Sequence, residues 1–382
     1  MARPFSAKPL KQTTLDRETL YSMHKVILGG EFDFPPPWMA GFCFRDGSPA
    51  FMRQRAGGPC GVLAAVQAFV LRELRERGGA RAPTIEEAGD ALVAALAHIV
   101  WSARVGRLAN VVSCSAGKLP PLREAVGELV CTQCSSLAEV MSAVRGCIGL
   151  WRIPDGPGII LLLYSLLLTR GLAMVQRDAD FPTPLVGSNG YCSQELVNLL
   201  LIGRAHSNVF DGEKTVGGGE GDGESGEGVR LRGIPRKAQV GFLTLFERQG
   251  QQGHPLLVVG NNLKRPLTNI FVVQSESHYS CLWAEGECPD LSNPEEAHMK
   301  GTGNTADDDD NVAVEGGPGC VFDLMYFDQM AERDNAVRLT IRRRDPSNPL
   351  PDCSTALPPL ENVILTRWPD AEISWNGEEI IL

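Results

Sequence analysis

The sequence lacks a long hydrophobic run, an excess of positive charge and an apolar leader. Its longest apolar run, 159–168, covers ten residues, whereas a membrane-spanning helix needs about 20. We therefore expect a core helix there and no membrane partner. The net charge of −10 argues against a nucleic-acid partner, because contacts to phosphates need a basic surface. Residues 1–8 lack the apolar stretch of a secretory signal, so we expect a cytoplasmic location, with the nucleus as an additional compartment.

The usual motifs for metals, nucleotides and serine nucleophiles are also missing. The chain has no GxSxG elbow, no phosphate-binding loop ending in GK and serine or threonine, and no HExxH. Cys131 and Cys134 form a single CxxC pair inside a segment that we predict to be helical, and a zinc site needs four ligands. We expect neither a cofactor nor a metal. The odd number of 11 cysteines suits reduced thiols in a reducing compartment.

The acidity of the chain is concentrated in two tracts. Residues 211–228 carry a net charge of −5 and residues 285–318 a net charge of −9, with few apolar side chains in either. Such segments bury too little apolar surface to fold, so we predict flexible insertions. The remainder has the composition of a globular protein, with 43% hydrophobic residues. We expect a flexible N-terminus over 1–15 and a single catalytic domain over 16–382.

Hydrophobic periodicity divides the chain into a helical half and a sheet half. Apolar residues recur at helical spacing in the first half, and the predicted helices cover 62–77, 84–101, 121–130, 135–145, 158–170 and 193–204. Short runs of β-branched and aromatic residues follow, and the predicted strands cover 240–245, 256–259, 270–274, 278–283, 321–327 and 337–341. The fold class is therefore α+β, and we expect one monomeric chain.

Cys60 differs from the other cysteines in its position. It follows Gly57-Gly58-Pro59 and begins a strongly predicted helix. The unpaired N–H groups and the dipole at a helix N-terminus favour a thiolate. Two glycines before it allow a substrate backbone to approach closely. The alternative is a small buried residue at a helix start, and Cys60 becomes a candidate nucleophile only if a base accompanies it.

His278 is the best placed of the six histidines to act as that base. It begins a predicted strand in the sheet half, and a histidine on a sheet that faces a cysteine at a helix N-terminus is the arrangement of papain-like cysteine hydrolases. A lone strand histidine is more often structural. The oxyanion of such a reaction needs donors, and the N–H of Cys60 and the side-chain amide of Gln54, six residues upstream, are the candidates.

Several stretches resemble one known family, the MINDY deubiquitinases. The segment 57–67, GGPCGVLAAVQ, resembles the nucleophile motif of one branch, and 190–205, GYCSQELVNLLLIGRA, resembles that branch's central helix. The segment 275–279, SESHY, resembles the histidine motif, and Trp375-Asn376-Gly377 resembles the closing strand. The resemblance covers most of residues 20–382. It implies a variant of the papain-like fold, with the cysteine in the helical half and the histidine in the sheet half.

The resemblance also implies a function and a division of roles. The family cleaves ubiquitin from polyubiquitin, with a preference for lysine-48-linked chains, so ubiquitin and polyubiquitin are the expected partners. Cys60 would be the nucleophile, His278 the general base and Gln54 the oxyanion donor. Either Asp323 or Asp328 would orient His278. The alternatives are a catalytically silent ubiquitin-binding scaffold of the same fold and a transglutaminase-like acyl transferase, for which the sequence has no supporting motif.

Overall fold

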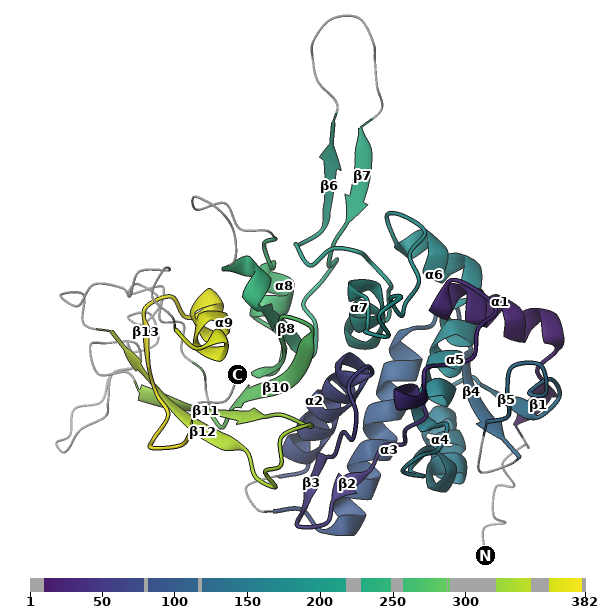
Figure 1. Ribbon diagram of the computed structural model, residues 1–382, viewed down its shortest axis with the longest axis horizontal. Helices are drawn as coiled ribbons and strands as arrows, with labels where there is room; N and C mark the ends of the chain where they lie inside the picture. Colours follow the sequence, from purple (N-terminus) through teal and green to yellow (C-terminus); the bar gives the residue numbers. More distant parts are fainter. Residues whose placement is uncertain are drawn as a thin grey trace, which may run out of the picture. The chain divides into compact units, whose positions relative to one another are not determined.

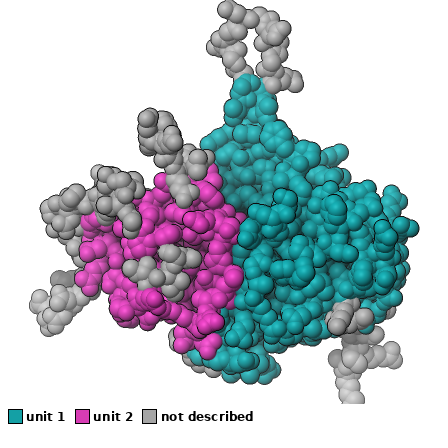
Figure 2. All heavy atoms as spheres, in the orientation of Figure 1, with its two compact units in different colours: residues 1–236 teal, residues 237–382 magenta. Residues whose placement is uncertain are grey.

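The computed structural model describes residues 10–78, 82–115, 119–217, 228–248, 257–286, 288, 321–344 and 357–379. The chain divides into two compact units, residues 1–236 and 237–382, which are coloured separately in Figure 2. Helices and sheets both occur, which agrees with the α+β class. The single catalytic domain over 16–382 stays a prediction.

Helices form most of the first unit (Figure 1). They are α1 (Arg17–Leu28), η1 (Pro36–Trp38), α2 (Cys60–Glu76), α3 (Ile85–Ser102), α4 (Leu137–Trp151), α5 (Gly158–Arg170), α6 (Leu172–Asp178) and α7 (Gln194–Ile202). α3 packs against α2, α4 and α5. α5 is buried along nearly its whole length, which confirms the expected core helix. Within the described ranges no single helix has the length and apolar character to cross a membrane, and α5 and α6 meet that test only as a pair bent by 87°.

The first unit also contains strands that the sequence pattern did not predict. They are β1 (Lys11–Thr14), β2 (Phe44–Arg45), β3 (Ser48–Met52), β4 (Ala109–Cys114), β5 (Leu129–Cys134), β6 (Glu213–Val216) and β7 (Val229–Arg232). β5 lies between β1 and β4 in an antiparallel sheet. The prediction of a helix over 121–130 was therefore wrong, because Gly127 has a positive φ of 87° and both edges of β5 are paired.

Two segments that we expected to be flexible contain paired strands. Within 1–15, β1 pairs with β5 through the register Lys11↔Gln133, because the backbone at the sheet edge offers hydrogen bonds that need no apolar side chain. Within 211–228, β6 pairs with β7. Residues 1–9 and 218–227, and most of the second acidic tract, lie outside the described residues.

The second unit is a six-stranded sheet in the order β13-β12-β11-β10-β9-β8. Its elements are β8 (Gly241–Thr244), η2 (Leu245–Glu247), α8 (Asn261–Lys264), β9 (Ile270–Ser275), β10 (His278–Ala284), β11 (Val321–Phe327), β12 (Val337–Arg343), α9 (Pro359–Arg367) and β13 (Ala371–Ser374). All neighbours are antiparallel except β8 and β9. The strand expected over 256–259 is absent from its described residues, 257–259. Trp375-Asn376-Gly377 follows β13 as a turn.

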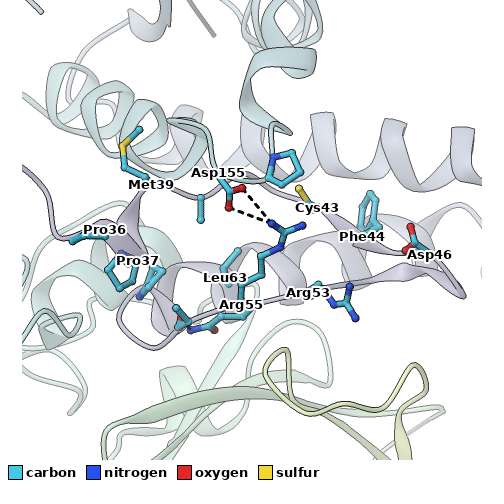
Figure 3. A pocket seen from close by; sticks show the side chains of 16 residues that line it. Pro36, Pro37, Met39, Cys43, Phe44, Asp46, Arg53, Arg55, Leu63 and Asp155 are labelled. Carbon is cyan, nitrogen blue, oxygen red and sulfur yellow. Dashed lines mark hydrogen bonds and ion pairs between the residues drawn. The ribbon is translucent and has the colours of Figure 1, made fainter. Parts of the chain in front are cut away.

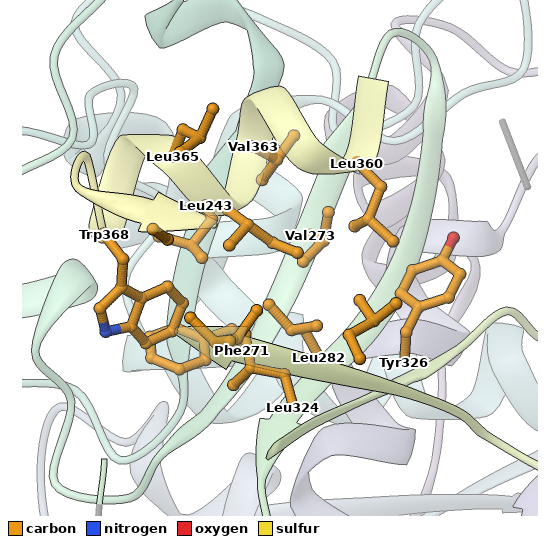
Figure 4. Packing of buried hydrophobic residues seen from close by; sticks show 14 of the residues in the cluster. Leu243, Phe271, Val273, Leu282, Leu324, Tyr326, Leu360, Val363, Leu365 and Trp368 are labelled. Atoms are coloured by element: carbon orange, nitrogen blue, oxygen red, sulfur yellow. The ribbon is translucent and has the colours of Figure 1, made fainter. Parts of the chain in front are cut away.

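The core of the second unit lies between this sheet and α9. Leu360 and Val363 of α9 belong to the same buried cluster as Leu243 and Phe271 of the sheet (Figure 4). The ring of Trp368 meets that of Phe271 edge-on, with 5.9 Å between the centroids. These side chains are almost completely buried, so the sheet that carries His278 is a rigid platform.

Candidate active site

Cys60 is the first residue of α2, as the sequence predicts. Pro59 precedes it, and no side chain caps the helix. The carbonyl of Pro59 accepts hydrogen bonds from the N–H groups of Val62 and Leu63. Cys60 itself is 1% exposed. The thiol therefore lies at the N-terminus of α2 in a water-poor setting.

The turn before Cys60 depends on Gly58. Its φ of 126° is in a region that side chains avoid, and an added Cβ would lie 3.3 Å from the carbonyl oxygen of Gly190. That carbonyl also accepts a hydrogen bond of 2.9 Å from Nε1 of Trp38. The Gly58 carbonyl in turn lies 3.9 Å from the Cys60 sulfur. The loop around Gly190 thus fixes the turn that presents the cysteine.

Gln54 lies on the segment that connects β3 to α2. Its Nε2 donates to the carbonyl of Ala56 at 2.7 Å, and the residue is 6% exposed. Its Oε1 is buried and has no hydrogen-bond partner among the described residues. β3 is held on α2 by Gln67, whose amide bonds the backbone of Met52 at 2.7 Å and of Ala50 at 2.9 Å. This anchoring fixes the strand that leads to Gln54.

A pocket of about 410 Å³ lies beside this segment (Figure 3). Gln54 and Pro59 contribute to its lining, together with charged side chains. Arg55 points toward Asp155, and their atoms Nη1 and Oδ1 are 3.2 Å apart. The surface beside Gln54 and Pro59 is therefore polar and partly charged.

Cys192 is a neighbour of Cys60 that sequence reasoning did not identify as part of the site. Its sulfur lies 3.8 Å from the Gly58 carbonyl, the group that the Cys60 sulfur also contacts. Burial raises the pKa of the Cys192 thiol, as does the nearby charge of Cys60, while the N–H groups of Gly61 and Val62 oppose that rise. A Cβ added at Gly61 would lie 3.0 Å from the Cys192 sulfur. The glycine after Cys60 was the available signal, since it leaves room for a close neighbour.

His278 begins β10, directly after a tight turn from β9. The turn places Glu276 at a φ of 54°. Nε2 of His278 donates to Oδ1 of Asp328 at 2.9 Å. Asp328 is 8% exposed, and its Oδ1 also accepts the N–H of Met330 at 2.8 Å. A buried carboxylate with two donors is itself held in place, so the imidazole has a defined orientation.

The structure distinguishes the two candidate partners of His278. Asp323 lies on β11, where its Oδ1 accepts the hydroxyl of Thr340 at 2.7 Å and its Oδ2 lies 3.8 Å from Arg338. Asp328 lies just beyond the end of the same strand and bonds His278. Of the two aspartates that the sequence left open, Asp328 makes the contact.

The candidate residues fall into two groups. Cys60, Gln54 and Cys192 belong to the first unit, and His278 and Asp328 to the second. The pairing of Cys60 with His278 stays a prediction. In the part of the chain that the structure describes, no three or more histidine, cysteine or acidic side chains cluster in a way that could hold a metal ion. The first group offers a thiol at a helix N-terminus. The second offers an imidazole that a carboxylate orients.

Comparison with known proteins places the chain in a family. The family model "Deubiquitinating enzyme MINDY-3/4, conserved domain" matches residues 24–295 and 317–377. The chain is 36% identical over 345 residues to the probable ubiquitin carboxyl-terminal hydrolase MINDY-4 of Homo sapiens, covering 86% of this chain and 41% of that protein. The corresponding protein of Mus musculus is 35% identical over 347 residues, with the same two coverages.

A second group of relatives carries a related name. The ubiquitin carboxyl-terminal hydrolase MINDY-3 of Bos taurus is 31% identical over 283 residues, covering 65% of this chain and 60% of that protein. The chain thus spans about two fifths of the length of the MINDY-4 relatives. No solved structure matches it. The match over most of its length shows that the chain belongs to the MINDY-3/4 family of deubiquitinating enzymes.

Proposed function

We propose that this chain is a cysteine-type deubiquitinase with a variant of the papain-like fold. It hydrolyses the isopeptide bond at the C-terminal glycine of ubiquitin, with lysine-48-linked polyubiquitin as its substrate. The observation that carries the proposal is the 2.9 Å hydrogen bond from His278 to Asp328. An imidazole oriented by a buried carboxylate can act as a general base and a general acid. The substrate class follows from the family to which the chain belongs. The linkage rests on the resemblance of the nucleophile motif.

In the proposed reaction the Cys60 thiolate attacks the carbonyl carbon of ubiquitin's terminal glycine. The N–H of Cys60 and the amide of Gln54 stabilise the oxyanion. Because Nε2 of His278 bonds Asp328, Nδ1 is the nitrogen that takes the thiol proton and returns it to the leaving lysine amine. Water then hydrolyses the thioester and releases ubiquitin, with His278 acting as the base.

The resting arrangement of Gln54 fits a donor that is held ready. One N–H of its Nε2 is used by the Ala56 carbonyl, and an amide nitrogen carries two hydrogens. The second hydrogen is the one assigned to the oxyanion. The Ala56 bond therefore positions the amide without consuming it.

A ubiquitin derivative with a C-terminal electrophile tests the proposal directly. We expect the parent chain to form a covalent adduct and Cys60→Ala to form none. Cys147→Ala, on α4, is the matched cysteine control and should react like the parent. An unreactive parent that still binds ubiquitin would make the silent scaffold the correct function.

A panel of diubiquitins of defined linkage tests the finer claim. We expect the lysine-48-linked dimer to be cleaved fastest and Cys60→Ala to cleave none of the panel. Equal rates on all linkages would remove the lysine-48 preference while leaving the hydrolase in place. Retained cleavage by Cys60→Ala would refute the nucleophile.

A further inference from the structure

Two cysteine sulfurs contact one carbonyl oxygen at the start of α2. Only Cys60 has a role in the proposed hydrolysis. Both sulfurs contact the carbonyl oxygen of Gly58, at 3.9 Å for Cys60 and 3.8 Å for Cys192. The Gly58 carbonyl is therefore a shared neighbour of the two sulfurs. The Cys192 sulfur also lies close to Gly61, the residue after Cys60.

Backbone hydrogen bonds on both sides of Cys192 fix its position. Val186 and Cys192 form a β-bridge around the turn that contains Gly190, and the N–H of Ser193 donates to the carbonyl of Leu185 at 2.9 Å. Ser193 then caps α7 by accepting the N–H of Leu196. Cys192 is thus held between a bridge and a helix start, so its approach to Cys60 is a fixed feature of the first unit.

We propose that Cys60 and Cys192 are a redox-modifiable pair that forms a reversible disulfide when a peroxide oxidises Cys60. The proposal rests on the proposed function in one respect, since it takes Cys60 as the reactive thiol. Cys192 is the resolving thiol, because its sulfur contacts the same carbonyl oxygen as the sulfur of Cys60. Burial also raises its pKa, so it stays a thiol and does not compete for the peroxide.

The disulfide would form in two steps. The Cys60 thiolate attacks one oxygen of hydrogen peroxide, an S–O bond forms, the O–O bond breaks, and the leaving hydroxide is protonated to water. Sulfur is oxidised to the sulfenic acid and the peroxide is reduced. The Cys192 sulfur then attacks the Cys60 sulfur, the S–S bond forms and the S–O bond breaks. The leaving hydroxide takes the Cys192 proton as a second water, and a thiol reductant regenerates both thiols.

The consequence is protection of the nucleophile. Without a resolving thiol, further peroxide converts a sulfenic acid to the sulfinic acid, which ordinary thiols do not reduce. With Cys192 in place, oxidation stops at a disulfide that dithiothreitol reverses. Cleavage activity would therefore be switched off by peroxide and restored by reduction.

Peptide mapping of the full chain tests the pair. The reduced protein is treated with graded hydrogen peroxide, alkylated under denaturing conditions and digested with trypsin without reduction. The arginines place Cys60 in the peptide 56–72 and Cys192 in the peptide 178–204, each with a single cysteine. We expect these two peptides to appear as one disulfide-linked species. Cys60 present only as sulfinic or sulfonic acid, or linked to a different cysteine, would overturn the proposal.

Variants provide the second readout. Cys192→Ser and Cys192→Ala should accumulate Cys60 sulfinic acid, and after dithiothreitol they should stay inactive relative to their own activity before oxidation. The parent and the control Cys43→Ser should recover nearly all of theirs. Equal recovery in Cys192→Ala and the parent would also overturn the proposal. Because the peptide mapping needs no ubiquitin, a disulfide without cleavage would refute the hydrolase alone, and cleavage without the disulfide would refute the redox pair alone.

Discussion

Nε2 of His278 and Oδ1 of Asp328 are 2.9 Å apart, although 50 positions separate the two residues in the sequence. The antiparallel pairing of β10 with β11 brings them together, because Cys281 lies opposite Phe327 in the register. The strand ends therefore determine which carboxylate meets the imidazole.

We predict that Asp328→Asn lowers the maximal rate of ubiquitin cleavage by on the order of 100-fold or more, because the amide no longer favours the productive tautomer of His278. Asp323→Asn is the matched control, since that carboxylate bonds Thr340 instead, and its turnover should stay at the parent level. Steady-state kinetics on diubiquitin give both values. A larger defect in Asp323→Asn than in Asp328→Asn would assign the orienting role to the other aspartate.

Gln54→Ala should lower the maximal rate by about 100–1,000-fold with ubiquitin affinity unchanged, because it removes an oxyanion donor. Its thiol should still react with an alkylating agent. Gln67→Ala is the contrasting variant: it loses two hydrogen bonds from its side chain to the backbone of β3 and should cost about 1–3 kcal/mol of stability. Kinetics, binding and urea denaturation separate these effects. Weakened ubiquitin affinity that accounted for the whole Gln54→Ala defect would make Gln54 a binding residue.

Gly61→Ala should reduce the free energy of unfolding by on the order of 1 kcal/mol. The new Cβ would lie 3.0 Å from the Cys192 sulfur and 3.2 Å from Val197, and this overpacking exceeds the gain in helix propensity. Gly57→Ala meets no heavy atom within 4 Å and serves as the control. Urea unfolding measures both. The loss should shrink in a Cys192→Ala background, and an unchanged loss there would mean that Val197 alone causes it.

The stability of the chain should fall as the pH is lowered through about 6.5. Burial lowers the pKa of His24 in the folded state, so below the unfolded pKa the unfolded chain binds a proton that the folded chain does not. Each such histidine contributes a slope of at most about 1.4 kcal/mol per pH unit. His98 and His206 behave alike, so His24→Gln should reduce the slope without abolishing it. Urea midpoints at several pH values give the slope, and an unchanged slope in His24→Gln would contradict the assignment.

Local patterns predicted the elements that carry the candidate residues. The glycines and proline before Cys60 and the apolar repeat after it mark the start of α2, and the short run of aromatic and apolar residues after His278 marks β10. These signals come from residues that are close together in the chain, so they can be recognised in a single sequence. The choice between Asp323 and Asp328 could not be made in this way, because it depends on the pairing register of β11.

Long-range pairing also explains what the sequence pattern got wrong. Cys131 and Cys134 were expected on a helix and lie on β5, which takes its conformation from partners on both sides. All four residues of β1 are exposed and polar, so no apolar periodicity could have indicated it. Cys192 lies beside Cys60 only because a turn and a β-bridge fold back onto α2, and no spacing rule connects positions so far apart.

The pairing of β10 with β11 keeps the His278–Asp328 contact independent of the length of the segment that connects the two strands. His278 and Asp328 lie at one end of the paired strands, and the chain leaves β10 at Ala284 and re-enters β11 at Val321 at the other end, about 20 Å away for strands of this length. A longer connection costs only a slowly rising closure entropy. The connection can therefore accept an inserted reporter domain or an affinity tag without altering the distance between the imidazole and its carboxylate.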